Sequence, residues 1–441
     1  MGSVVNARTR DVSDMWPLGL MRARAGHPPP QVEVATPRTA AEVAELLSTG
    51  RRVVPAGGLS GVCGAVAPGP GDLVLDMREL TRVEIDADNL IVRAEAGVMG
   101  LDLEHRLNEA GLTLGHFPSS LPSATVGGLV STRSSGQEST RHGSIDDMVL
   151  GLTVVLPGGA IVEARPVPHS AVPALHQVFL GAEGGLGVIL EAVLRVRRLP
   201  ERTAGRAWRL AAVDHGLDVL REVMQQGLRP LVLRLYDPED SLFQGLDGGC
   251  LLVGATAGPA PVAEAEAEVL ASIAGARGGE PLGEEPWARW LRHRFDLSAE
   301  RLRDLLGPPG AYVDTIEVAG TWTALPALYR KTKAHLAQAG LAMCHFSHAY
   351  PQGCCAYFTF AGSAQSEAEA ERAYLEAWRG TMEIALDHGA TITHHHGVGR
   401  ARAPWIRAEL DGWWQVWELI RTALDPRATM NPNAMGGHID S

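Results

Sequence analysis

The chain is poor in the features that mark secreted, membrane-spanning or nucleic-acid-binding proteins. It has five cysteines in 441 residues, an odd number without CxxC spacing, which does not indicate a disulfide framework. The N-terminus lacks an apolar signal core, and no run approaches the ~18 apolar residues of a membrane span. A net charge of −12 argues against nucleic acid or an anionic membrane surface as the main partner. With no peroxisomal address at its end, the chain is expected to be cytoplasmic, with reduced, buried thiols.

What is present is the composition of a soluble globular protein, with 45% hydrophobic and 20% charged residues. A chain of 441 residues is too long for one ordinary hydrophobic core, so two or three structural units are expected. The acidic balance also implies that an anionic substrate would need local positive partners.

Short strands alternate with helices, which indicates an α+β or α/β unit. Strands are predicted at 32–34, 53–55, 73–75, 90–94, 151–156, 160–163, 188–196, 231–235, 251–255 and 356–360, with a hairpin-type turn at 157–159. Helices are predicted at 40–47, 263–274, 325–339 and from the capping residue Ser366 to about Asp387. The predicted organisation is an N-terminal segment (1–30), a cofactor-binding domain (31–199), an inserted cap domain (200–388) and a C-terminal segment (389–441).

Three glycine-rich segments would bring backbone close to a ligand: Pro55–Gly61, Ser119–Gly136 and Gly181–Ile189. Converging amides and hydroxyls can hold a pyrophosphate without positive charge. None of the segments is a Rossmann fingerprint, and no Walker lysine follows the first. Any one of them alone is better explained as a tight turn. Three in fixed order, two of them rich in hydroxyls, predict a large phosphate-bearing cofactor.

The sequences of these loops resemble those of the FAD-binding domain of vanillyl-alcohol oxidase-type flavoproteins. Within that group they resemble the alkyldihydroxyacetonephosphate synthase family. GHFPSSLPSATVGGLVSTRSSG, HGSIDDMVLGLTVVLPGGAIVE and GAEGGLGVILEAVLRVR carry the likeness, which covers about Val34 to Asn433. The resemblance implies an α+β fold with a two-lobed PCMH-type FAD-binding domain. An α+β cap is inserted before a C-terminal segment that returns to the active site.

The resemblance also implies the residues that contact FAD. They are Pro55, Gly57, Gly58, Leu59, Ser60, Gly61, Ser119, Ser120, Ser123, Thr125, Gly127, Gly128, Thr132, Ser134, Ser135, Glu183, Gly184, Gly187, Val188 and Ile189. Some relatives attach flavin through a histidine in the first loop, where this chain has Leu59 and Ser60. Non-covalent FAD is therefore expected.

A second group of candidate residues lies near the C-terminus. His394, His395 and His396 follow the strand-like 390–393, so on an extended chain His394 and His396 would share one side and His395 the other. Imidazoles can act as bases, bind anions or hold a metal, or form a structural cluster. Alternating sides and the lack of an acidic cluster disfavour a metal, and none is predicted. Tyr350 sits at a Pro/Gly-flanked turn, where packing at a strand edge is the alternative to catalysis.

The synthase family has a catalytic tyrosine matching Tyr350, a three-histidine motif matching His394–His396, and substrate-binding arginines matching Arg234 and Arg303. Without that resemblance the arginines would be interpreted as surface ion pairs. Segment 278–294 contains Trp287, Trp290 and several arginines, and its sequence has little similarity to the family's. It is expected in the cap over the substrate.

The implied activity is an FAD-dependent transfer that exchanges an acyl for an alkyl ether group through a flavin N5 adduct. The alternative is an FAD-linked oxidase or dehydrogenase of a D-2-hydroxy acid or related alcohol, whose relatives usually carry a metal-binding His/Glu set in the cap strand. Cys354–Phe360 has no such set. A non-catalytic flavin-binding protein would leave Tyr350 and the histidines idle.

The partners expected from this function are small. The substrate would be an anionic or acyl-bearing molecule, and contact with a membrane surface is expected if it is a lipid. The family resemblance is compatible with a homodimer.

Overall fold

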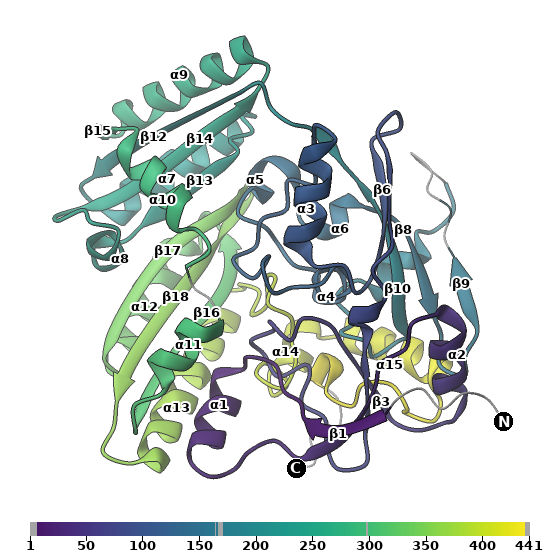
Figure 1. The fold of residues 1–441 in the computed structure, drawn as a ribbon. Helices are drawn as coiled ribbons and strands as arrows, with labels where there is room; N and C mark the ends of the chain where they lie inside the picture. The colour runs from purple at the N-terminus through teal and green to yellow at the C-terminus, as the bar shows by residue number, and fades with distance from the viewer. Residues whose placement is uncertain (1–6, 164, 166–170, 297–298, 437–441) are drawn as a thin grey trace.

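A computed structural model describes residues 7–163, 165, 171–296 and 299–436 of the chain. Within these residues the strands form sheets of four, five and seven strands and one two-stranded pair (Figure 1). None of the helices in the described ranges is both long and apolar enough to cross a bilayer.

The two smaller sheets are built from the N-terminal half of the chain. The four-stranded sheet has the order β1-β2-β4-β3, with β1 at Ala7–Asp11, β2 at Gln31–Ala35, β3 at Val53–Ala56 and β4 at Leu73–Asp76. The five-stranded sheet has the order β5-β6-β10-β8-β9, with β5 at Val83–Asp86, β6 at Ile91–Glu95, β8 at Val149–Val155, β9 at Ile161–Glu163 and β10 at Val188–Arg195. The pair joins β7 (Leu112–Thr113) to β11 (Arg197–Arg198).

The seven-stranded sheet is built from the second half of the chain. Its order is β15-β12-β14-β13-β17-β18-β16, with β12 at Arg202–Leu210, β13 at Val232–Tyr236, β14 at Cys250–Gly258, β15 at Glu280–Gly283, β16 at Ala311–Thr321, β17 at Leu341–Tyr350 and β18 at Gly353–Ser363. All of these strands fall inside the range 200–388 that the sequence assigns to the cap. The exact domain boundaries stay a prediction.

The helices pack on both halves (Figure 1). On the first half they are α2 (Ala40–Ser48), α3 (Gly100–Glu109), α4 (Val126–Ser131), α5 (Ser139–His142) and α6 (Ile145–Met148), with 3₁₀ turns at Met77–Glu79 and Leu175–Phe179. On the second they are α7 (Val213–Gln225), α8 (Pro238–Phe243), α9 (Ala260–Ala276), α10 (Glu285–His293), α11 (Ala299–Leu306), α12 (Leu325–Leu336) and α13 (Glu367–Asp387). The C-terminal segment holds α14 (Ile406–Leu410), α15 (Trp413–Leu424) and a 3₁₀ turn at Ala434–Gly436.

Strand alternation gives the seven-stranded sheet two chemically different faces. Leu235 and Phe346, with Phe358 and Ile316, lie in the buried core under α7, α9, α12 and α13. Because neighbouring side chains on a strand point to opposite faces, the residues between these apolar ones point away from the helices. The register pairs Glu317 with Tyr357, Tyr357 with His345, and His345 with Tyr236. This row, with Arg234 two residues before Tyr236, defines what we call the site face.

Both ends of the described chain connect the two halves. Strand β1 extends the four-stranded sheet, and α1 (Pro17–Arg24) packs on α13 and β16. After α13 the chain bridges from β16 to β3, pairing Thr391 with Ala319 and Met430 with Val53. In Figure 1 this yellow segment returns to the purple and blue half. It therefore holds the cap sheet against the glycine-rich loops.

Candidate active site

The three glycine-rich loops meet in the structure. A Cβ on Gly58 would lie 1.7 Å from the carbonyl oxygen of Ser123, and one on Gly57 would lie 2.1 Å from Thr125 Oγ1. A Cβ on Gly184 would lie 2.9 Å from Cγ of Pro55. Glycine at these positions lets the first loop pack directly against the other two.

The first loop presents free hydrogen-bond donors. In the described part of the chain, the backbone amides of Gly58–Gly61 donate to no other group, and neither does the hydroxyl of Ser60 or Ser120. Leu59 has a positive φ of 58°, so the amides around it turn toward one side. Consecutive amides in this arrangement are the donor set that a pyrophosphate requires. The residues therefore fit the phosphates of FAD.

Several other predicted cofactor residues hold the loops in shape. Thr125 accepts a hydrogen bond from the Gly128 amide at 3.2 Å and so caps α4, and the Thr132 hydroxyl donates to the Gly128 carbonyl at 2.9 Å. The remaining contacts are Ser119 with Gln137, the Ser123 hydroxyl with the Ser120 carbonyl, Ser134 with His116, Ser135 with Ser144, Gly127 against Ala96, and Gly187 against Val155. Val188 and Ile189 are buried in β10.

Glu183 joins the third loop to the C-terminal segment. Its buried carboxylate accepts hydrogen bonds from the amides of Val398 at 2.7 Å, Gly399 at 3.0 Å and Met435 at 2.9 Å. Its backbone carbonyl accepts from the Asn431 side chain at 2.7 Å. The structure thus gives Glu183 a clamping contact, in addition to the FAD contact implied by the resemblance.

The three-histidine segment is curled around a buried carboxylate. Glu317 on β16 accepts hydrogen bonds from three successive amides, those of His394 at 2.9 Å, His395 at 3.2 Å and His396 at 2.8 Å. The Arg402 guanidinium lies 3.2 Å from the same carboxylate, and both side chains are fully buried. The charge of Arg402 holds the pKa of Glu317 below its ordinary value despite its burial. The ion pair therefore fixes the backbone that carries the histidines.

The extended arrangement predicted for this segment is wrong. Residues 390–393 form only a single bridge, at Thr391, because the following amides bend around Glu317 instead of continuing a ladder. The rings of His394 and His395 consequently meet, with 2.8 Å between their Nδ1 atoms, rather than pointing to opposite sides. The His395 and His396 ring centres are 4.4 Å apart.

Tyr350, at the end of β17, is brought to this cluster. Its hydroxyl lies 2.8 Å from Nε2 of His394. Burial raises the pKa of Tyr350 above its ordinary value and lowers that of His394, so the pair is neutral near pH 7. His396 is held uncharged in the same way, with its pKa lowered to about 4 by burial. Its buried Nδ1 makes no hydrogen bond within the described chain and lies 3.8 Å from the Glu317 carboxylate.

Two residues that were not predicted from the sequence extend the cluster. The Tyr357 hydroxyl lies 2.7 Å from His395 Nε2 and 2.6 Å from His348 Nε2. His348 Nδ1 contacts the Ser139 hydroxyl of α5. Alternation with Ala356 and Phe358 could have placed Tyr357 on the site face. His348 gave no such signal, because its partner is 209 residues away.

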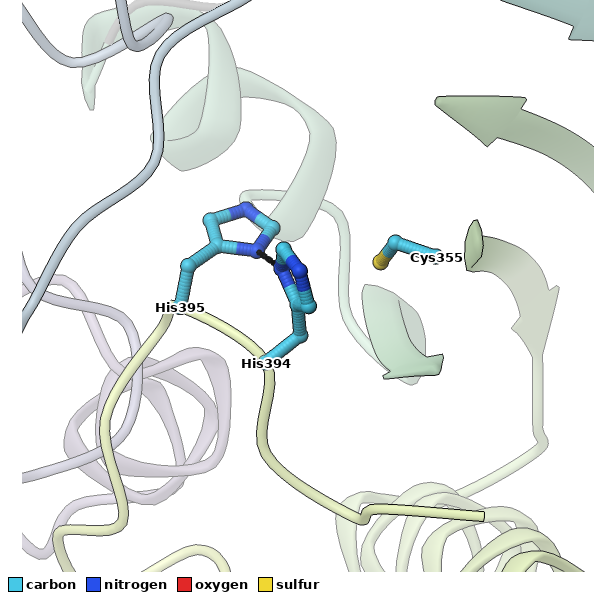
Figure 2. A group of neighbouring side chains, drawn as sticks. All are labelled: Cys355, His394 and His395. Carbon is cyan, nitrogen blue, oxygen red and sulfur yellow. Dashed lines mark hydrogen bonds between the residues drawn. The ribbon is translucent and has the colours of Figure 1, made fainter. Parts of the chain in front are cut away.

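Figure 2 shows Cys355 beside the paired rings of His394 and His395, whose ligand atoms lie within 4.8 Å of one another. A metal ion would have to displace the hydrogen bonds that these rings make. Burial also raises the pKa of the Cys355 thiol well above its ordinary value, which disfavours the thiolate that a metal binds. The geometry favours hydrogen bonding over metal ligation.

The two predicted arginines differ in their placement. Arg234 is buried on the site face, where Nε donates to the Tyr236 hydroxyl at 3.0 Å and the guanidinium lies over the Trp290 ring. It has no carboxylate partner among the described residues. Asp240 acts on Arg234 only through space, so the guanidinium keeps donors that can bind a phosphate or carboxylate. Arg303, by contrast, is exposed on α11 and is not brought to the cluster.

Trp290 belongs to α10, so the segment 278–294 does lie beside the predicted substrate-binding arginine. At its end, Arg294 pairs with Glu138 at 3.3 Å and covers the Phe117 ring. This contact joins the cap to the loop that carries Ser119.

Two family comparisons cover most of the chain. Residues 32–165 match the FAD binding domain family, and residues 199–435 match the family of FAD linked oxidases, C-terminal domain. The alkyldihydroxyacetonephosphate synthase of Dictyostelium discoideum is 28% identical over 91% of this chain and 72% of its own length. An uncharacterized FAD-linked oxidoreductase of Escherichia coli strain K12, YgcU, is 32% identical over 81% of this chain and 78% of its own length.

A solved structure of alkyldihydroxyacetonephosphate synthase superimposes with a TM-score of 0.82 at 25% identity, covering 96% of this chain and 81% of that one. The predicted α+β PCMH-type fold and the FAD cofactor are confirmed. The chain belongs to the FAD-linked oxidase family and is an FAD-dependent enzyme similar to the alkyldihydroxyacetonephosphate synthases.

Proposed function

We propose that the enzyme exchanges the acyl group of an acyl-dihydroxyacetone phosphate for the alkyl group of a long-chain alcohol. The observation that carries this proposal is the uncharged, partly to fully buried Tyr350–His394–His395 set together with Arg234, which has no carboxylate partner in the described chain. Proton-transfer groups beside an unpaired cation suit a phosphate-bearing substrate that loses and regains a proton.

The chain's own residues would divide the work as follows. The amides of Gly58–Gly61 and the hydroxyls of Ser60 and Ser120 would hold FAD, which when bound supplies an electron-accepting ring system beside the substrate. Arg234 would bind the phosphate or the ketone oxygen, with Trp290 shielding it from water. Tyr350 would exchange a proton with the substrate, and His394 would exchange one with Tyr350.

The net reaction is balanced and redox-neutral. Palmitoyl-dihydroxyacetone phosphate and hexadecanol would give hexadecyl-dihydroxyacetone phosphate and palmitate. The test is incubation of the FAD-loaded enzyme with both substrates and detection of the ether product by mass spectrometry. Tyr350→Phe, which removes only the hydroxyl, should lower the rate by about 10²- to 10⁴-fold with FAD still bound. Intact holoenzyme that makes no ether product would refute this substrate assignment.

The second candidate is oxidation of a D-2-hydroxy acid. The name of the Escherichia coli relative and the unpaired Arg234, which would suit a carboxylate equally well, favour it. Glu317 could not serve there as a metal ligand, since its carboxylate is taken up by Arg402 and three amides. Bleaching of the flavin absorbance by D-lactate without oxygen would support oxidation. No bleaching together with ether product would exclude it.

A further inference from the structure

Six side chains form an unbroken series of hydrogen bonds from the cap strands to the FAD-binding half. The series runs Tyr350, His394, His395, Tyr357, His348, Ser139. The four bonds from Tyr350 to His348 measure 2.8, 2.8, 2.7 and 2.6 Å. The four inner residues each bond on both sides, so a proton entering at one end can be passed along the series.

Hydrogen counting shows that this series has a direction. A neutral imidazole donates from one nitrogen and accepts at the other, and the Tyr357 oxygen must donate in one bond if it accepts in the other. Fixing the direction of one bond therefore fixes all five. In one state Tyr350 donates to His394 and its oxygen is free to accept a proton. In the reverse state His394 donates to Tyr350, whose own hydrogen is free to be given away.

The far end of the series is built with unusual backbone. His348 has a φ of 51° and sits at a β-bulge between Ser347 and Ala349. Left-handed backbone is uncommon outside glycine, and bulges near active sites re-aim side chains. Helix α5 holds the bulge twice, with the Ser139 hydroxyl on His348 and Thr140 Oγ1 accepting from the Ala349 amide at 3.2 Å.

We propose that His348 stores the proton that Tyr350 takes from the substrate, with Tyr357 as the bridge; the proposal rests on the proposed function. When Tyr350 accepts a proton, it passes its own hydrogen to His394 Nε2. His394 gives its Nδ1 hydrogen to His395, His395 gives its Nε2 hydrogen to Tyr357, and Tyr357 gives its hydrogen to His348 Nε2. One proton has entered and His348 is the imidazolium. Reversal of the four transfers returns it.

The charges facing His348 make this storage responsive to substrate. Burial is the main cause that lowers the pKa of His348 well below its ordinary value, and the positive charge of Arg234 on β13 adds to it. His345 on β17, with His394 and His396 in the C-terminal segment, would add to it only when protonated. Two acids lie near this row: Asp240 of α8 is bonded to His345, and Glu317 is paired with Arg402. An anion bound to Arg234 would offset that cation's repulsion and so raise the pKa of His348 when substrate is in place.

The test uses variants of the holoenzyme that interrupt the hydrogen-bond series while keeping most of the side-chain volume. Tyr357→Phe removes the bridge but keeps the ring that stacks on His345 at 4.5 Å. His348→Asn tolerates the left-handed backbone but cannot hold the proton. Tyr329→Phe, which removes a hydroxyl bonded to Asp237, is the matched control. Each cut should lower kcat about 10- to 100-fold with KM unchanged, and the double variant should lose no more than either single one.

Two further measurements separate a relay from a structural role. The wild type should show a solvent deuterium effect on kcat with a curved dependence on deuterium content, which becomes linear in both variants but not in Tyr329→Phe. Additive losses, or an unchanged isotope dependence, would overturn the proposal.

A readout without turnover keeps the test independent of the proposed reaction. With ¹⁵N-labelled histidine, His394 and His395 should each show one tautomer in the wild-type holoenzyme and a mixture in Tyr357→Phe. Dihydroxyacetone phosphate should shift His348 toward imidazolium. Tautomers that are indifferent to Tyr357 would overturn the relay, whereas a tautomer response without ether product would refute only the substrate assignment.

Discussion

Burial determines the charge of the site one residue at a time. An imidazole removed from water loses most of the hydration that stabilises its charged form, so its pKa falls unless a carboxylate compensates. His116 shows the effect most clearly. It is 1% exposed, its Nε2 lies 2.9 Å from the Ser134 hydroxyl, and burial lowers its pKa to about 3.

His116 should therefore make stability depend on pH in a known direction. The unfolded chain binds a proton at this residue below about pH 6.5, whereas the folded chain does not until about pH 3, so stability is lost as the pH falls through this window. His116→Gln can keep the bond to Ser134 and does not titrate. Urea unfolding should show the wild type losing about 2 kcal/mol relative to the variant between pH 7.5 and 5. A parallel pH dependence of the two proteins would contradict the neutral, buried ring.

Arg234 should act on substrate affinity more than on the chemical step. Arg234→Met keeps much of the apolar stem but removes the charge, so KM for the anionic substrate should rise about 10- to 100-fold with a smaller change in kcat. The KM of Arg234→Lys should lie between those of the wild type and Arg234→Met, because an ammonium keeps the charge but lacks the planar pair of donors of a guanidinium. Exposed Arg303 gives the control, since Arg303→Met should change neither constant. A loss confined to kcat would argue against substrate binding by Arg234.

At the scale of elements, the histidine segment depends on strand β16. Glu317→Gln keeps the shape of the side chain but leaves Arg402 buried without its carboxylate partner and puts a donor group against backbone amides. We expect a loss of about 3–5 kcal/mol in unfolding free energy. Urea denaturation measures it, and Glu376→Gln, at an exposed ion pair on α13, should cost less than about 1 kcal/mol. Equal costs would mean that the buried pair does not hold the segment.

The sequence indicated most strands that have a continuous apolar run and missed strands whose run is interrupted by charged residues. Strand β10, which is apolar except for Glu191 and its last residue, is found within two residues of its prediction, as is β4. Strand β16 was not predicted, because Asp314 and Glu317 interrupt its apolar pattern, and β12 was missed because three arginines do the same. In β16, the alternation that hides the strand also places Glu317 on the site face.

For the candidate site, residue types were more predictable than their geometry. The glycine spacing and the His394–His396 motif could be recognised, but the curl around Glu317 could not. It depends on a carboxylate 77 residues earlier and an arginine from the following turn. Contacts of this kind follow from the tertiary fold, not from local propensity.

At the scale of the molecule, the C-terminal segment joins the two halves. Non-covalent FAD is still a prediction, made because the first loop offers Leu59 and Ser60 where a covalent attachment would use histidine. Acid precipitation should leave the yellow colour in the supernatant. Colour that stays in the protein pellet would show a covalent link formed elsewhere.

Glu183 gives a second test at this scale. Glu183→Gln removes the carboxylate that accepts hydrogen bonds from three backbone N–H groups of the C-terminal segment. It also places the side-chain NH₂ of glutamine against one of these N–H groups. We expect faster hydrogen exchange at Val398–Gly399 and weaker FAD binding by about tenfold, measured by fluorescence titration. Glu42→Gln, on the exposed surface of α2, is the control. Slow exchange retained in Glu183→Gln would show that the segment is held by other contacts.

The bridge from Val53 to Met430 also has a consequence for how the enzyme is made. The glycine-rich loops leave the ribosome long before Asn431 and Met435, whose bonds to Glu183 complete the third loop. During synthesis, the glycine-rich loops are therefore complete before the C-terminal segment that contacts them. We therefore expect tight FAD binding only after translation of the C-terminal segment is complete.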